Sequence, residues 1–132
     1  MIFVDTSYWV ALIAAADAHH VEAMELLRSV ADEPLVTSNH VRGETWTFLR
    51  RRYGHGVAVR FLDRLERSER VTVERVTERM EDDALRFLRR HDEREYSFVD
   101  ATSFALMRSL RIKRALTFDG DFAASGFQTL RA

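Results

Sequence analysis

The sequence predicts a three-layer α/β/α sandwich with a central, mainly parallel sheet of about five strands. Short apolar or β-branched stretches alternate with helical segments along the whole chain, and the first stretch, residues 1–4, is apolar throughout. This alternation is typical of βαβ units with right-handed crossovers. At 132 residues, with no repeat and no linker, the chain is expected to form one domain over residues 1–132.

The first half of the chain is expected to contribute two strands and four helices. Asp5 or Thr6 is of the type that caps a helix, and the first helix follows the first strand directly. Pro34 precedes the second strand, Asn39 is expected to cap the third helix, and Gly54 is expected to end it. The expected strands are 1–4 and 35–38, and the expected helices are 6–17, 19–31, 40–53 and 57–69.

The second half is expected to contribute three strands and two more helices. Thr77 and Ser97 each precede a helical stretch and are expected to cap it. A turn-rich loop is expected over 119–126, because Asp-Gly is a strong turn signal. The expected helices are 77–91 and 97–110, and the expected strands are 70–76, 114–118 and 127–130.

Composition excludes several classes of function. The absence of cysteine excludes disulfides, thiolate metal sites and cysteine nucleophiles. No apolar run approaches the roughly 20 residues of a membrane-spanning helix, and no basic segment precedes the first apolar stretch. We therefore expect a cytoplasmic protein with no membrane partner. The histidines show no spacing typical of metal ligands, and neither a Gly-x-Ser-x-Gly motif nor a phosphate-binding glycine loop occurs.

Three aspartates stand out against apolar surroundings. Asp5 follows the first strand, and Asp119 follows the strand 114–118 in the same way. Asp100 is the only charged residue from 98 to 107, in a helix that is apolar all round and is therefore expected to be buried. Each also has a structural interpretation: Asp5 as a helix cap, Asp100 as part of a capping box with Ser97, and Asp119 as a turn residue.

Glu44 is a fourth candidate, in the helix expected over 40–53. At about 100° per residue it falls beside the apolar stripe formed by Val41, Thr45 and Phe48, rather than opposite to it. The alternative is a boundary glutamate that points to water.

These four acids can converge at the carboxyl edge of a parallel sheet, where open α/β sheets place their sites. Carboxylates gathered there would repel one another, and a hard divalent cation removes that repulsion. Oxygen ligands without cysteine or a histidine pair select Mg²⁺ or Mn²⁺, and such an ion suits phosphodiester hydrolysis.

The net charge of the chain outside these four acids is positive, which is compatible with a polyanionic partner. Setting aside the four acids leaves 17 acidic residues against 20 basic ones, of which only Lys113 is not arginine. The arginines at 50–52 and 89–90 are candidates for contacts with a phosphate backbone. Alternatively, they complement the dipoles at the ends of helices.

The order of these motifs resembles that of a known family. Asp5 in VDTS, Glu44 in SNHVRGETWTFLRRRYG, Asp100 in YSFVDATSFALM and Asp119 in ALTFDGDFAASGF resemble the PIN domain, and the likeness to VapC-type ribonuclease toxins covers nearly the whole chain. The resemblance implies a Mg²⁺- or Mn²⁺-dependent endoribonuclease that cuts RNA and inhibits translation or growth. It also implies a homodimer and a cognate antitoxin protein that occludes the site.

The resemblance further implies roles for individual residues. Asp5, Glu44, Asp100 and Asp119 would be the catalytic, metal-binding acids. Asp121 is a candidate fifth metal ligand, in a position where many relatives carry a basic or polar residue. In the same DTS signature, Thr6 and Ser7 would support the first carboxylate by hydrogen bonding.

Two other interpretations remain open at the level of sequence. The first is a PIN-like module that binds RNA or protein without cutting it, although the intact acidic set argues against that. A Mg²⁺-dependent phosphoryl-transfer or receiver-like domain also places an aspartate after its first strand. That class needs a second, nucleophilic aspartate nearby and a suitably placed lysine, whereas Asp5 is followed by Thr6 and Ser7.

Overall fold

The fold is organised around a sheet of five parallel strands. A computed structural model describes all 132 residues, and its strand order is β3-β2-β1-β4-β5. Every neighbouring pair is parallel, so the predicted sheet is confirmed. The strands are β1 (Ile2–Val4), β2 (Leu35–Ser38), β3 (Val71–Glu74), β4 (Arg114–Leu116) and β5 (Gln128–Thr129).

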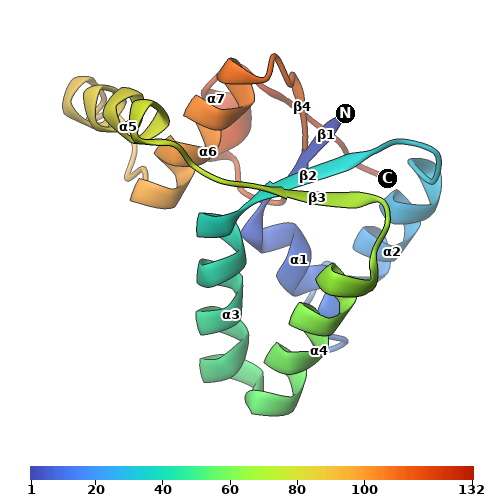
Figure 1. Cartoon of the computed structure of the whole chain (residues 1–132). Helices are drawn as coiled ribbons and strands as arrows, with labels where there is room; N and C mark the ends of the chain where they lie inside the picture. The colour runs from blue at the N-terminus through green and yellow to red at the C-terminus, as the bar shows by residue number, and fades with distance from the viewer.

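Seven helices cover the two faces of this sheet. Helices α1 to α4 lie on one face and α5 to α7 on the other, which gives the three predicted layers (Figure 1). None of these helices has the length and apolar character needed to cross a membrane. Their bounds are α1 (Thr6–Ile13), α2 (His20–Ser29), α3 (Asn39–Tyr53), α4 (His55–Arg67), α5 (Glu78–Arg90), α6 (Phe98–Ser109) and α7 (Asp121–Ala124).

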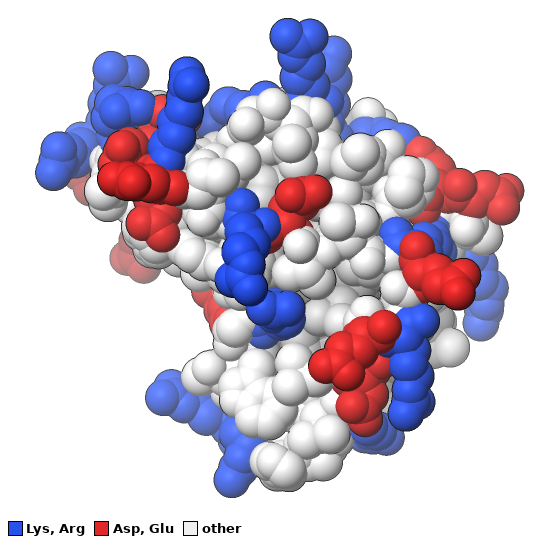
Figure 2. Space-filling model, viewed as in Figure 1, with Lys and Arg blue, Asp and Glu red and all other residues white.

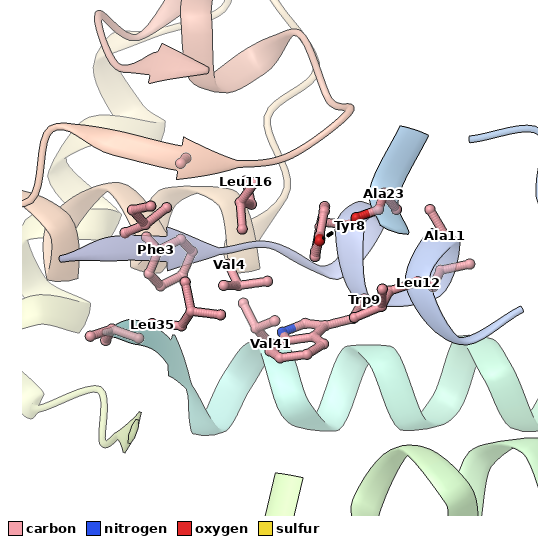
Figure 3. Close-up of a cluster of buried hydrophobic side chains, with 14 of the residues drawn as sticks. Phe3, Val4, Tyr8, Trp9, Ala11, Leu12, Ala23, Leu35, Val41 and Leu116 are labelled. Carbon is pink, nitrogen blue, oxygen red and sulfur yellow. Dashed lines mark hydrogen bonds between the residues drawn. The ribbon is translucent and has the colours of Figure 1, made fainter. Parts of the chain in front are cut away.

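The core forms around β1, the central strand. Its three residues are fully buried, and aromatic side chains of α1 pack beside them (Figure 3). Tyr8 and Trp9 keep their polar atoms satisfied there: the Tyr8 hydroxyl donates to the Ala23 carbonyl at 2.7 Å, and the Trp9 indole donates to Thr37 Oγ1 at 3.3 Å. These bonds allow large aromatic groups to be buried without an unpaired donor.

The register of β1 and β4 places the ends of two neighbouring strands side by side. Val4 is paired with Leu116, and the Asp5 amide donates to the Leu116 carbonyl at 3.1 Å. The residues that follow, Asp5 and Thr117, therefore leave the sheet together at its carboxyl edge. Helix α1 begins there as well, with Asp5 as its N-cap.

Two sequence predictions of helix ends are wrong. The first helix ends at Ile13 rather than at 17, because Ala14 is extended and Asp17 accepts a hydrogen bond from the His19 amide in the following turn. Ser38, not Asn39, caps α3, by accepting from the Val41 amide. Asn39 is used otherwise: its side-chain oxygen accepts from the Val76 amide after β3.

The segment 119–126 was expected to be a loop but contains α7. Asp119 Oδ1 accepts a hydrogen bond from the Asp121 amide at 2.9 Å, which turns the chain into this short helix. Phe122 is fully buried and anchors the helix to the core. A four-residue helix is too short to produce a helical periodicity in the sequence.

Candidate functional site

The carboxyl edge of the sheet carries a cleft of about 370 Å³. It lies where β1 and β4 end, beside the first turns of α1 and α6, and α3 passes along it. The structure brings all four predicted acids to this cleft, whose lining includes Asp5, Glu44, Asp100 and Asp119.

Asp5 is the most deeply buried of these acids, with 3% of its surface exposed. Its Oδ2 atom accepts hydrogen bonds from Ser7 Oγ and from Thr117 Oγ1, both at 2.9 Å. Burial raises the pKa of Asp5 to about 6, and the two hydroxyl donors partly offset this rise. Asp5 is thus both the cap of α1 and a member of the cleft.

The support around Asp5 was predicted only in part. Ser7 donates to Asp5 through its hydroxyl as expected. Thr6 supports Asp5 through its backbone amide alone, because its buried hydroxyl has no hydrogen-bond partner. The second donor is Thr117, which sequence reasoning missed. Thr117 reaches Asp5 because β4 pairs with β1 in the observed register, and neither the pairing nor the register can be read from the sequence.

Asp100 occupies the first turn of α6 and is 7% exposed. Its Oδ2 accepts from the Ser97 amide at 3.0 Å while its own amide donates to Ser97 Oγ at 2.9 Å, which completes the predicted capping box. Burial, followed by repulsion from Asp119 and Asp5, raises the pKa of Asp100 to about 7. The structural and the functional interpretations of this residue are therefore compatible.

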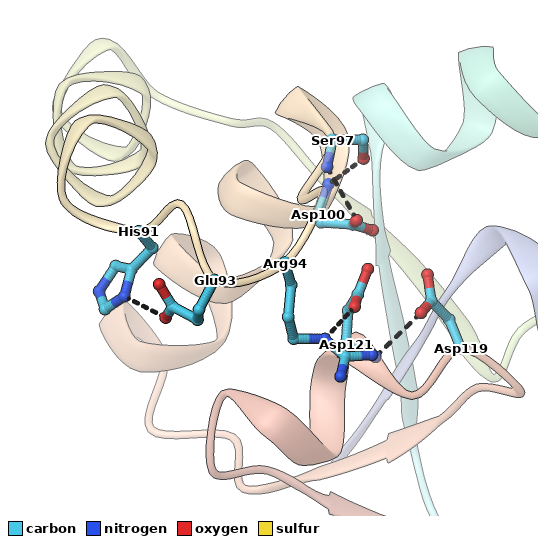
Figure 4. Close-up of polar contacts among 7 residues, drawn as sticks. All are labelled: His91, Glu93, Arg94, Ser97, Asp100, Asp119 and Asp121. Carbon is cyan, nitrogen blue, oxygen red and sulfur yellow. Dashed lines mark hydrogen bonds and ion pairs between the residues drawn. The ribbon is translucent and has the colours of Figure 1, made fainter.

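Asp119 and Asp121 complete the acidic cluster from the β4–α7 connection. Carboxylate oxygens of Asp100, Asp119 and Asp121 lie within 4.8 Å of one another, an arrangement that can hold a metal ion (Figure 4). Burial also raises the pKa of Asp119. The Asp119 amide donates to Thr117 Oγ1 at 3.0 Å, so the same hydroxyl links Asp119 to Asp5.

Glu44 lines the cleft from α3 and is half-buried. No hydrogen bond or ion pair holds its side chain in the structure. The apolar stripe used to place it was partly wrong: Val41 and Thr45 are buried, but Phe48 is 45% exposed and lines the cleft. Leu49 takes the core position instead.

Two further residues line the cleft without any sequence signal. Asp17 and His19 belong to the turn between α1 and α2, and the His19 ring stacks on Phe118 with centroids 4.3 Å apart. No spacing in the sequence relates this turn to the acids, because only the fold brings it to the carboxyl edge.

The chemistry of the cleft fits a hard divalent cation. Its convergent ligand atoms are carboxylate oxygens, and three of its aspartates have raised pKa values because their charges are buried and crowded. A cation with a preference for oxygen would stabilise the charged forms of all three. Which of these acids are ligands stays a prediction.

Comparison with known proteins assigns the fold to a family. The family model for the PIN domain matches residues 2–127. The chain belongs to the PIN-domain family. This PIN domain is 56% identical over 132 residues to the 23S rRNA-specific endonuclease VapC20 from two strains of Mycobacterium tuberculosis, covering 99% of this chain and 98% of that protein. It is therefore a PIN domain of the VapC type.

Solved structures agree with this assignment. The crystal structure of Mycobacterium tuberculosis VapC20, described as a sarcin–ricin loop cleaving toxin, matches this PIN domain with a TM-score of 0.93 and 53% identity, over 100% of both chains. FitAcB from Neisseria gonorrhoeae matches with a TM-score of 0.67 and 16% identity, over 98% of this chain and 96% of that one. The second likeness shows the fold alone.

Proposed function

We propose that this chain is a Mg²⁺- or Mn²⁺-dependent endoribonuclease that cuts 23S rRNA in its sarcin–ricin loop. The observation that carries the proposal is the gathering of Asp5, Glu44, Asp100 and Asp119 in one cleft of a VapC-type PIN domain. The RNA target is inferred from the name and description of VapC20, which is 56% identical over nearly the whole chain.

We assign the metal to the aspartates at the ends of β1 and β4 and at the start of α6. Asp5, Asp100 and Asp119 would hold the ion. Glu44, which lines the same cleft, and Asp121, which belongs to the same acidic group, are the further candidates. When bound, a divalent cation polarises the phosphoryl oxygen and lowers the pKa of the attacking water.

The protein's own contribution is to orient these acids before the ion arrives. The hydroxyl bonds from Ser7 and Thr117 both fall on Asp5 Oδ2, which leaves Oδ1 without a side-chain partner. The capping box uses Asp100 Oδ2 and fixes that carboxylate in the same way. Each acid therefore keeps one oxygen for a ligand while the other sets its direction.

A basic groove beside the cleft supports RNA as the substrate. The groove measures about 910 Å³ and shares Glu44 and Phe48 with the acidic cleft, and Arg51 and Arg52 line it. Figure 2 shows the molecule hollowed on its left side, with basic side chains below the hollow and both acidic and basic ones on the lobe above it. We expect the two arginines to bind phosphates of the RNA backbone. Arg89 and Arg90, the other predicted pair, lie in the last turn of α5 and do not line this groove.

The proposal that the chain is a VapC-type toxin implies two protein partners, an antitoxin and a second copy of the chain. As a VapC-type toxin the chain would have a cognate antitoxin that covers the cleft, and we expect it to form a homodimer. A nuclease that cuts ribosomal RNA meets its substrate in the cytoplasm, so we expect it there. Co-purification with the product of the neighbouring reading frame, and light scattering of the chain alone, test these points.

The function itself is tested with purified protein and an RNA hairpin carrying the sarcin–ricin loop. We expect a single cut in the loop with Mg²⁺ or Mn²⁺, and none in a hairpin with a scrambled loop. Cleavage of both hairpins would support the nuclease activity but contradict the sarcin–ricin loop as its specific target. Binding of the RNA without cleavage under any metal condition would favour the non-catalytic module instead.

A further inference from the structure

Arg94 is a basic residue that pairs directly with the acidic cluster. It lies in the connection between α5 and α6, and its Nε atom donates to Asp121 Oδ1 at 2.6 Å (Figure 4). Its guanidinium also lies over Gly120, where a Cβ atom would come within 3.5 Å of Arg94 Nη2. Arg94 therefore also lies against the residue that precedes Asp121.

This ion pair is the outer end of a chain of hydrogen bonds that reaches the centre of the cleft. The Asp121 amide donates to Asp119 Oδ1 at 2.9 Å, and the Asp119 amide donates to Thr117 Oγ1 at 3.0 Å. Thr117 in turn donates to Asp5 Oδ2 at 2.9 Å. Arg94 is therefore tied, through the 117–121 segment, to two of the acids assigned to the metal.

We propose that Arg94 is a positioning residue that holds Asp121 as an outer carboxylate and prevents it from becoming a full ligand of the ion. The proposal rests on the metal site proposed above. One Asp121 oxygen is occupied by Arg94, although the Asp121 carboxylate lies within 4.8 Å of those of Asp100 and Asp119. An additional full carboxylate ligand would fill a coordination position that water or phosphate needs and would neutralise more of the ion's charge.

The test measures the affinity of the RNA-free protein for Mn²⁺, by electron paramagnetic resonance of the free ion at low ionic strength. Arg94→Gln removes the charge but keeps a hydrogen-bond donor, and Arg94→Lys keeps the charge. Asp121→Asn removes the held carboxylate. Arg28→Gln, at an exposed arginine in the last turn of α2 that forms no ion pair, is the matched control.

We expect Arg94→Gln to tighten Mn²⁺ binding about three- to tenfold, since a nearby positive charge is lost and Asp121 is freed. The gain should shrink at about 0.5 M salt, where exposed charges are screened. Asp121→Asn should weaken binding, and Arg94→Lys and Arg28→Gln should leave it near that of the wild type.

Two results would overturn the inference alone. If the wild type binds Mn²⁺ and Arg94→Gln leaves the affinity unchanged, the ion pair is only a surface contact. If Arg94→Gln weakens binding, Arg94 supports the ligands rather than withholding one. A wild-type protein that binds no Mn²⁺ would reject the proposed metal site itself, and the inference with it.

Discussion

The hydroxyl groups of Ser7 and Thr117 lie 3.1 Å apart although 110 positions separate them in the chain, and both contact the same oxygen of Asp5. Ser7 Oγ also accepts from the Phe118 amide, and Thr117 Oγ1 accepts from the Asp119 amide. This pair of hydroxyls joins the start of α1 to the end of β4. It therefore sets the position of two of the acids assigned to the metal.

Thr117→Val tests that support, because valine keeps the shape and removes the hydroxyl. The Asp5 carboxylate loses a donor that lowers its pKa, so the pKa of Asp5 should rise further above about 6. A larger share of Asp5 is then protonated near neutral pH, and the rate profile for RNA cleavage should move to higher pH. The lost hydrogen bonds should also cost about 1 kcal/mol of unfolding free energy. Thr72→Val, at an exposed position of β3, is the control. An unchanged pH dependence of the cleavage rate in Thr117→Val would contradict the support that the Thr117 hydroxyl gives to Asp5.

The stability of the metal-free protein should decrease from pH 5 to pH 8. The pKa values of Asp5 and Asp100 are raised to about 6 and about 7, so the folded state binds more protons than the unfolded state above pH 4. The stability gained by keeping these acids neutral is lost as the pH rises through the folded-state values, by about 2–4 kcal/mol in total. Glu22, whose pKa is lowered to about 2 by Arg131, titrates below this range. Urea unfolding at several pH values measures the slope, and stability that rises with pH would contradict the pKa assignments.

Glu44→Gln should reduce the activity of the cleft without changing the stability of the protein. Glu44 is half-buried and makes no hydrogen bond, so the unfolding free energy should change by no more than about 0.5 kcal/mol. Cleavage and Mn²⁺ affinity should both fall, because a carboxylate is removed from the cleft that Asp5 also lines. Full activity in this variant would show that Glu44 is a boundary residue that points to water.

Removal of the metal should stop the reaction. We expect EDTA to abolish RNA cleavage and an excess of Mg²⁺ or Mn²⁺ to restore it. Thiol reagents should have no effect, because the chain contains no cysteine. Full activity in EDTA would reject the metal mechanism and direct attention to His19, which also lines the cleft.

Local chemistry made much of this site predictable. Three acids stand out in the sequence because each places a carboxylate at the end of an apolar strand or in a buried helix: Asp5, Asp100 and Asp119. Burying a carboxylate costs free energy unless the charge is paired or binds a metal, so such a position indicates a function. The capping box at Ser97 is visible because its spacing is a property of a single helix turn. The parallel sheet followed from the alternation of elements, which does not depend on register.

The missed features are those that depend on contacts distant in sequence. Thr117 supports Asp5 only because of the pairing between β1 and β4, and His19 reaches the cleft only because α1 ends early. Asn39 was expected to cap a helix, but a contact with Val76, 37 residues away, uses its side chain. Helical periodicity placed Phe48 toward the core, whereas the fold leaves that face of α3 open at the cleft.

The central claim is tested most directly by measuring RNA cleavage and metal-free thermal unfolding of Asp100→Asn together, at pH 8. Asparagine keeps the oxygen that accepts from the Ser97 amide and removes a buried charge that is repelled by Asp5 and Asp119. We predict that cleavage is abolished while the melting temperature is equal to that of the wild type or higher. Retained cleavage with a lowered melting temperature would contradict the account, since Asp100 would then be a helix cap and not a ligand of the catalytic metal.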